Sequence, residues 1–250
     1  MSGVGGSDRI FGVHAVDALL QQHPDRARHL YLQDERRGQR LAALAQRARE
    51  HGIPVSHHSR RELDALSGGA RHQGAVLDAA GLPELGEHDL EDLLDGLDHA
   101  PLLLVLDGVQ DPQNLGACLR TAAGAGADAL VIPRDRAAPL SAAVRKVAAG
   151  AAERLPLVRV PNLARVLRML CRRGVWLVGA EAAGTRSLYQ TDLGGPVALV
   201  LGAEGRGLRR LTREACDYLV RIPLAAGVES LNVSVAAGVC LYEAVRQRSE

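Results

Sequence analysis

Short apolar runs alternate with helix-like stretches over residues 101–250, and this alternation constrains the fold more than any other feature of the chain. Each run is long enough for a strand but too short for a helix. Runs of this kind are typical of strands that are buried on both faces of a parallel sheet. We therefore expect one α/β domain here, with a last amphipathic helix over 231–247. The six expected strands are LLLVLD (102–107), ALVIP (129–133), PLVRV (156–160), VWLVGAE (175–181), VALVLG (197–202) and LVRIP (219–223).

Polar and glycine-rich blocks stand where these strands should end and the next helices begin. In open α/β sheets this carboxyl edge is where ligands bind. Several such blocks on one sheet therefore indicate a small-molecule site at that edge. The five blocks are LDGVQDPQNLGACLRTA (106–122), AGAAERLPLVRV (149–160), LVLGAEGRGLRRLT (199–212), VRIPL (220–224) and ESLNVSVAAG (229–238).

The first 79 residues carry a smaller alternating pattern of their own. Helix-like stretches, one of them with Ser59 as its expected N-cap, alternate with three strand-like runs that end in QGAVLDA (73–79). We expect four parts in the chain. They are a flexible tail over 1–8, a small α/β domain over 9–79, an acidic linker with one short helix over 80–100, and the larger α/β domain over 101–250.

The composition neither indicates nor excludes nucleic-acid binding. The net charge is +1, so the chain has no strongly basic overall balance, and aromatic residues for base stacking make up only 2%. All of its 30 basic residues except Lys146 are arginines. Arginine suits bidentate phosphate contacts, although GC-rich coding explains the same bias.

The cysteines and apolar runs point to a cytoplasmic protein. The four cysteines lie far apart and form no C-x-x-C pair, which argues against both a zinc site and a disulfide framework. Reduced thiols are typical of the cytosol. No apolar run is long enough to span a bilayer, and MSGVGGSD lacks an apolar signal core. We expect no membrane contact and no bound metal.

The block GAEGRG (202–207) is glycine-rich but is not a dinucleotide-binding fingerprint. Its spacing is G-x-x-G-x-G, and no acidic residue ends a strand about 20 residues later. A glycine-rich strand-to-helix turn still lets backbone N–H groups approach a ligand. Glu204 inside it is either a functional carboxylate or a solvated turn residue.

Four polar residues stand at or near expected helix starts. Asn114 follows the first strand and is expected to act as an N-cap, and Arg120 lies six residues later among Ala, Leu and Cys. A charge on such a face is costly unless it is paired or placed in a cleft. Ser230 and Asn232 open the last helix, where free N–H groups favour anions. Capping explains one of these two residues but not both.

Other catalytic constellations find little support. The pairs His57-His58 and His72-Gln73 are isolated, and histidines of this kind are more often surface or structural groups. No His, Cys and Asp spacing suits a metal site. A Ser-His-Asp hydrolase would need a G-x-S-x-G turn, which the sequence lacks.

Together and in this order, the blocks resemble the SpoU branch of the knotted methyltransferases. Asn114…Arg120 is similar to the first motif of that family, LGAEGRGL to the second, and IPL…SLNVSVAAG to the third. The match covers about 101–248. FGVHAVDALL and RHQGAV, within the first 79 residues, resemble an RNA-binding domain that this branch often carries, itself similar to certain ribosomal proteins.

The resemblance implies a fold, a cofactor and a reaction. The parallel sheet would belong to an α/β-knot domain with a deep trefoil knot, and the protein would be a homodimer through that domain. It would transfer a methyl group from S-adenosylmethionine to the ribose 2′-OH of a guanosine in the P-loop of 23S rRNA, which supports ribosome maturation.

The resemblance also implies the site residues. Arg120 is the base proposed in the family, but a guanidinium stays protonated, so we expect it to orient the ribose or contact phosphate. Glu204 would anchor Arg120 or the bound nucleotide. The catalytic residues would be Asn114, Arg120, Glu204, Ser230 and Asn232, and the cofactor-binding residues Gly202, Ala203, Gly205, Ile222, Pro223 and Leu231.

The first domain supplies the RNA-contact candidates. They are Arg60, Arg61, Arg71 and His72, because these residues cluster near expected element ends. Three other functions stay open. They are methylation of tRNA ribose, methylation of a base nitrogen, and a non-catalytic role in ribosome assembly.

Overall fold

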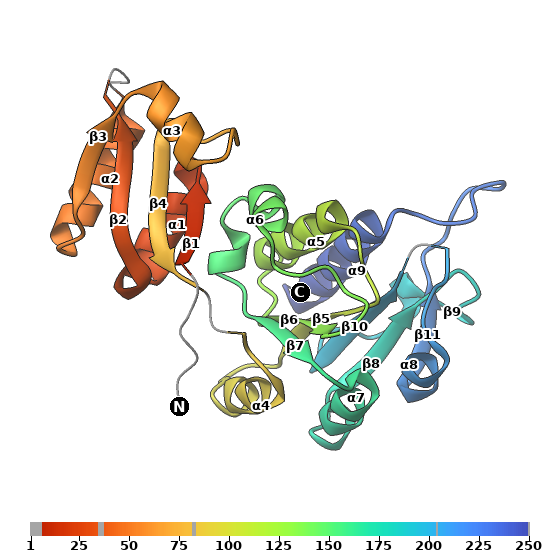
Figure 1. The fold of residues 1–250 in the computed structure, drawn as a ribbon. Coiled ribbons are helices and arrows are strands. Elements are labelled where there is room, and N and C mark those ends of the chain that lie inside the picture. The colour runs from red at the N-terminus through yellow and green to blue at the C-terminus, as the bar shows by residue number, and fades with distance from the viewer. Residues whose placement is uncertain (1–6, 35–37, 82–83, 204, 250) are drawn as a thin grey trace. The chain divides into compact units, whose positions relative to one another are not determined.

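The computed structural model describes residues 7–34, 38–81, 84–203 and 205–249, and Figure 1 shows their helices and strands. The chain divides into two compact units. The first comprises residues 1–83 together with the segment 140–154, and the second comprises 84–139 and 155–250. Glu204, one of the expected catalytic residues, lies outside the described residues.

The first unit is built on a mixed four-stranded sheet. Strand β4 lies between β1 and β2 and is antiparallel to both, whereas β3 runs parallel to β2 at the edge. Apolar faces of α1 and α2 form a core with the strands, with Leu19 and Leu44 buried. The elements are β1 (Ser7–Phe11), α1 (Val13–Gln22), η1 (Pro24–Arg26), β2 (Ala27–Gln33), α2 (Gln39–Glu50), β3 (Val55–His58), α3 (Arg60–Leu66) and β4 (Ala75–Ala80).

The expected elements of this unit are present, with one addition. Ser59 caps α3 and forms a capping box with Glu62, as the sequence predicts. The prediction of a flexible tail over 1–8 is wrong for its last two residues, because β1 begins at Ser7. A pattern as short and polar as SDRIF is not typical of a strand, but pairing with β4 buries Ile10.

The segment 140–154 belongs to the first unit, although the sequence pattern groups it with residues 101–250. It contains α6 (Ala142–Ala148) and η2 (Ala151–Glu153). The buried Glu153 carboxylate accepts hydrogen bonds from Arg26, at 2.7 Å, and from Arg145, at 2.5 Å. A buried carboxylate needs such partners, and this network therefore ties the segment to the N-terminal sheet.

The second unit contains the expected parallel sheet, with strand order β7-β6-β5-β10-β8-β11-β9. Every neighbouring pair in it is parallel. Six strands match the six apolar runs, and the two-residue β9 is an addition that no apolar pattern marks. The strands are β5 (Leu102–Asp107), β6 (Ala129–Pro133), β7 (Leu157–Val160), β8 (Trp176–Ala180), β9 (Arg186–Ser187), β10 (Val197–Gly202) and β11 (Tyr218–Arg221).

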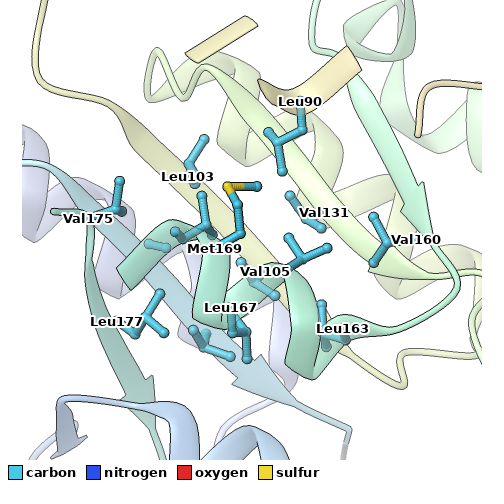
Figure 2. Packing of buried hydrophobic residues seen from close by; sticks show 14 of the residues in the cluster. Leu90, Leu103, Val105, Val131, Val160, Leu163, Leu167, Met169, Val175 and Leu177 are labelled. Atoms are coloured by element: carbon cyan, nitrogen blue, oxygen red, sulfur yellow. The ribbon is translucent and has the colours of Figure 1, made fainter. Parts of the chain in front are cut away.

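Helices cover both faces of this sheet, which explains why its strands are apolar throughout. Helices α5 and α9 lie side by side on one face, and α4, α7 and α8 lie on the other (Figure 1). On the α7 side, Leu167 and Met169 pack against strand residues such as Val105 (Figure 2). The remaining elements are α4 (Glu87–Asp95), α5 (Pro112–Gly124), α7 (Leu163–Arg172), η3 (Leu188–Gln190), α8 (Arg210–Ala215) and α9 (Val233–Arg248).

The stretch 80–100 is more than a linker. The one short helix expected in it is present as α4, but Leu90 is fully buried in the core of the second unit and Leu85 bridges to Val158. The pattern hides this because α4 is mostly acidic. The threading of the C-terminal segment through a trefoil knot stays a prediction from the resemblance. None of the helices in the described ranges is long and apolar enough to cross a membrane.

Candidate active site

Two adjoining cavities lie at the carboxyl edge of the parallel sheet, where the sequence predicts a ligand site. Cavity A, of about 490 Å³, lies among the segments that follow β8, β10 and β11. Cavity B, of about 430 Å³, lies between the segment after β5 and the turn after β10. Both volumes are in the range of small-molecule sites. The two cavities share Ala203, Arg206, Gly207 and Val233 in their walls.

Cavity A brings together most of the residues that the sequence assigns to the cofactor. Ile222 follows β11, and Leu231 precedes α9, so segments far apart in the sequence meet here. Ser230, expected among the catalytic residues, also lines this cavity and is exposed. Pro223 is exposed and is not in the wall, whereas its neighbour Leu224 is. The cofactor candidates in the wall are Gly202, Ala203, Gly205, Ile222 and Leu231.

The turn after β10 explains the glycines of GAEGRG. The Gly207 N–H donates to the Ala203 carbonyl at 2.9 Å, which closes the turn, and Gly205 and Gly207 have φ angles of +73° and +63°. A β-carbon on Gly202 would overlap the backbone of Gly207 and Leu208. The second motif therefore needs glycine for two reasons: the backbone passes too close to Gly202 for a side chain, and Gly205 and Gly207 have positive φ angles.

Asp107 anchors this turn to the sheet, and the sequence analysis missed its role. Asp107 ends β5 opposite Gly202 and is 1% exposed. Its carboxylate accepts a hydrogen bond from the Arg209 N–H at 3.0 Å and forms an ion pair with the Arg209 guanidinium. A carboxylate at the end of an otherwise apolar run is the signal that could have identified it.

Asn114 and Asn232 meet across the interface of α5 and α9. The Asn232 amide donates to Asn114 Oδ1 at 2.9 Å, while Asn232 Oδ1 accepts from the Ser234 N–H and caps α9. The expectation that Asn114 is an N-cap is wrong, because Asp111 caps α5 and Asn114 lies in its first turn. Asn114 is thus available to line cavity B.

Arg120 lies outside the walls of both cavities. It is on α5, six residues after Asn114, and its side chain is exposed, whereas Cys118 and Leu119 are buried. The described walls of cavities A and B do not include Arg120. Its charge therefore does not lie on the buried apolar face that the sequence predicts, and Arg120 is in the wall of neither cavity, unlike Asn114.

Three other arginines line cavity B instead. They are Arg136, Arg206 and Arg209, and the sequence analysis assigned none of them to a site. Arg136 and Arg206 are exposed, so both guanidinium groups are available to an anion. The wall also holds the amides of Gln110 and Asn114 and the carboxylates of Asp107 and Asp111. Since Asp107 pairs with Arg209, the guanidinium groups of Arg136 and Arg206 are the ones that suit a phosphate, and the amides suit a hydroxylated sugar.

Two thiols of the second unit, Cys216 and Cys240, are poor nucleophiles. Burial raises the pKa of Cys216 to about 12, and burial likewise raises the pKa of Cys240 to about 12, so both stay protonated at neutral pH. In the part of the chain that the structure describes, no three His, Cys, Asp or Glu side chains are grouped for a metal ion.

The RNA-contact candidates of the first unit fall into three environments. Arg60 and Arg71 line a polar cavity of about 1020 Å³ together with Arg40. Arg61 is exposed on α3 outside this cavity. His72 is buried; its Nε2 lies 3.0 Å from Asp64 and its Nδ1 accepts from the Gly74 N–H. Both ring nitrogens are engaged, so His72 supports the loop. It also lines the polar cavity, and its role as a phosphate contact stays a prediction.

Sequence profiles of two families match the chain over nearly its whole length. Residues 101–242 match the SpoU rRNA Methylase family, and residues 9–85 match a family described as RNA 2'-O ribose methyltransferase substrate binding. The chain is 55% identical over 242 residues to 23S rRNA (guanosine-2'-O-)-methyltransferase RlmB of Pseudomonas syringae pv. tomato, covering 97% of this chain and 96% of that protein. It is 50% identical over 243 residues to RlmB of Escherichia coli, covering 97% and 100%.

Solved structures show the same relationship. The SpoU methyltransferase AviRb from Streptomyces viridochromogenes, in complex with the cofactor AdoMet, superposes with a TM-score of 0.81 at 26% identity, covering 98% of this chain and 91% of that one. An AdoMet-bound rRNA methyltransferase from Sinorhizobium meliloti gives a TM-score of 0.77 at 26% identity, covering 96% and 87%. With the profile match over more than half of the chain, these relationships establish that this protein belongs to the SpoU rRNA methylase family.

Proposed function

We propose that this protein transfers the methyl group of S-adenosylmethionine to the ribose 2′-OH of a guanosine in the P-loop of 23S rRNA, in the cytoplasm, and so supports ribosome maturation. The observation that carries the proposal is the pair of adjoining cavities, one lined by the glycine-rich turn and the other by arginines and Asn114. S-adenosylmethionine fits cavity A, whose wall combines apolar side chains with backbone at strand ends. A nucleotide fits cavity B.

The residues of this chain position the nucleophile. When bound, the cofactor supplies a methyl group on a sulfonium, which an oxygen attacks in line. Asn114, held by Asn232, and Ser230 offer amide and hydroxyl groups that can orient the ribose. Orientation alone can contribute several kcal/mol to catalysis. Arg206 and Arg136 can bind the flanking phosphates, and a phosphate oxygen beside the ribose is a suitable acceptor for the 2′-OH proton.

The exposed position of Arg120 supports a dimer with shared active sites. Helix α9 presents Val235 and Tyr242, which are 51% and 52% exposed and lie seven residues apart on one face. A two-fold contact through the α5 and α9 surface would be self-complementary and would bring Arg120 of one chain toward the cavities of the other. Leu241 of the same helix is buried in the core and therefore does not face a partner.

A ribosomal substrate fits this chain better than a tRNA. The first unit matches a substrate-binding family over residues 9–85, and the curated relatives that share both units are named for 23S rRNA. The direct test is to map ribose methylation in total RNA from cells with and without this protein. We expect one 2′-O-methylguanosine in the P-loop of 23S rRNA to disappear without it, and a lost methyl group in tRNA alone would contradict the proposal.

Substitution of Gly202 tests the assignment of cavity A. Gly202→Ala should weaken S-adenosylmethionine binding at least tenfold, because the added methyl group would overlap Gly207 and push the turn into or away from the cavity. Isothermal titration calorimetry measures this directly. Gly195→Ala is the matched control, since no described atom lies within 4 Å of the added carbon there. Equal affinity of the two variants would rule out a cofactor role for this turn.

Arg120 and Asn114 variants test the shared site. Arg120→Ala should keep cofactor affinity but lower methyl transfer to 23S rRNA at least about a hundredfold, the scale of a lost positioned group. Arg120→Ala and Asn114→Ala subunits can be mixed and allowed to exchange, so that half of the dimers hold one subunit of each kind. In each mixed dimer, one of the two sites combines an intact Arg120 with an intact Asn114. The mixture should therefore recover about one quarter of the wild-type activity.

Light scattering should accompany this experiment and report twice the 26.5 kDa mass of the chain. Mixing two preparations of the same variant is the control and should restore nothing. A fully active monomer, or no recovery in stable mixed dimers, would refute the shared site.

Arginines of the first unit should determine RNA affinity and not cofactor affinity. Arg60→Gln and Arg71→Gln remove positive charges from the wall of the polar cavity. Each change should reduce the slope of log affinity against log salt by about 0.7–0.9 for a 23S rRNA fragment, as expected for one lost phosphate contact. Arg49→Gln, on the exposed part of α2 outside this cavity, should leave the slope unchanged. An equal salt dependence of RNA affinity in all three variants would show that the wall of this cavity does not contact RNA.

A further inference from the structure

Glu181 places a carboxylate in the wall of cavity A that no sequence motif predicts. The residue directly follows β8, and its backbone N–H donates to the Val220 carbonyl at 2.9 Å. Strand β8 lies between β10 and β11 in the sheet. Glu181 is therefore fixed between the two strand ends that carry Gly202 and Ile222, at the centre of the cavity wall.

This carboxylate is buried but incompletely satisfied. The Glu181 side chain is 9% exposed, and its Oε2 receives no hydrogen bond from the residues that the structure describes. Arg213 from α8 lies 2.8 Å from Oε2 and neutralises its charge, without the alignment of a hydrogen bond. A buried carboxylate that lacks hydrogen bonds is costly, so Glu181 has an unused capacity to accept one.

The surroundings favour a ligand as the missing donor. Most of the side chains that face cavity A near Glu181 are apolar, among them Ala182, Ala183 and Leu201. Arg213 also lines the cavity, but its side chain is 51% exposed and is free to move toward solvent when a ligand enters. A polar ligand group that reaches Glu181 therefore meets an acceptor whose ion-pair partner among the described residues is that half-exposed guanidinium.

We propose that Glu181 accepts a hydrogen bond from a hydroxyl or amine group of S-adenosylmethionine and contributes to cofactor affinity. This inference rests on the proposed binding of the cofactor in cavity A. An ionised carboxylate only accepts hydrogen bonds, and the cofactor carries donors in its ribose hydroxyls, its adenine amine and its ammonium group. The positive sulfonium further favours a negative group in the wall.

Calorimetry with three ligands tests the proposal on the full-length protein. Glu181→Gln keeps the shape of the side chain but replaces one carboxylate oxygen with a donor. It should weaken S-adenosylmethionine about tenfold or more, the effect of a lost charge-assisted hydrogen bond. S-adenosylhomocysteine lacks the sulfonium charge, and 5′-methylthioadenosine lacks the amino acid. A loss for all three ligands assigns the donor to the nucleoside, whereas a loss only for the first two assigns it to the ammonium group.

Controls separate this inference from a structural role and from the proposed function. Glu214→Gln is the matched control, at the residue that follows Arg213 on α8. It removes an exposed carboxylate that pairs with Arg210 and is not in the cavity wall. This variant should bind S-adenosylmethionine like the wild type. Thermal melting without ligand should show that Glu181→Gln is folded. Unchanged affinity of a folded Glu181→Gln variant would overturn the inference alone. Failure of the wild type to bind S-adenosylmethionine would overturn the cofactor assignment itself.

Discussion

The candidate active site depends on one ion pair, between the buried Asp107 at the end of β5 and the partly exposed Arg209 after the glycine-rich turn. The Asp107 side chain has no exposed surface, and the carboxylate binds both the backbone and the guanidinium of Arg209. Removing Arg209 would leave the buried Asp107 carboxylate without its cation, which is costly. The pair fixes both ends of the 203–209 turn, because Gly202 is already held in the sheet opposite Asp107.

This fixed turn separates two cavities and contributes to both. Its backbone faces the cavity that we assign to the cofactor, while Arg206 and Arg209 also reach the cavity that we assign to the nucleotide. A methyl donor and an acceptor held in two adjoining cavities by one rigid turn lose little further freedom when they react. Asn114 and Asn232 fix the opposite side through a hydrogen bond between α5 and α9. Because the turn is held by the ends of β5 and β10, the parallel sheet fixes the positions of the residues that line both cavities.

The first unit has a separate source of stability and a different surface. Its sheet encloses its own core, and the Arg26, Glu153 and Arg145 network joins residues 140–154 to it. The segment that carries Glu153 is one of the five polar blocks, so a block expected at the ligand edge serves instead to hold two parts of one unit together. Arg60 and Arg71 line the polar cavity of this unit. We propose that they bind RNA there and take no part in the methyl transfer in the second unit.

The sequence by itself determined the local structure. Apolar runs such as 102–107 and 197–202 become strands with the predicted bounds, because residues buried on both faces leave a continuous signal. Ser59 caps the helix that the pattern assigns to it, since capping depends on a few neighbouring residues. The motif resemblance predicted the family before any strand pairing was known.

Only the tertiary structure decided which polar residues meet. Asp107 and Arg209 are 102 residues apart, and the sheet order brings them together. Burial of His72, exposure of Arg120 and placement of Glu181 in the cavity wall likewise depend on packing between distant segments. A pattern reports how polar each position is, but the environment of a charge is set by every element that packs against it. For this reason the sequence predicted the edge of the sheet at which the two cavities lie, whereas the charges that line them became visible only in the folded chain.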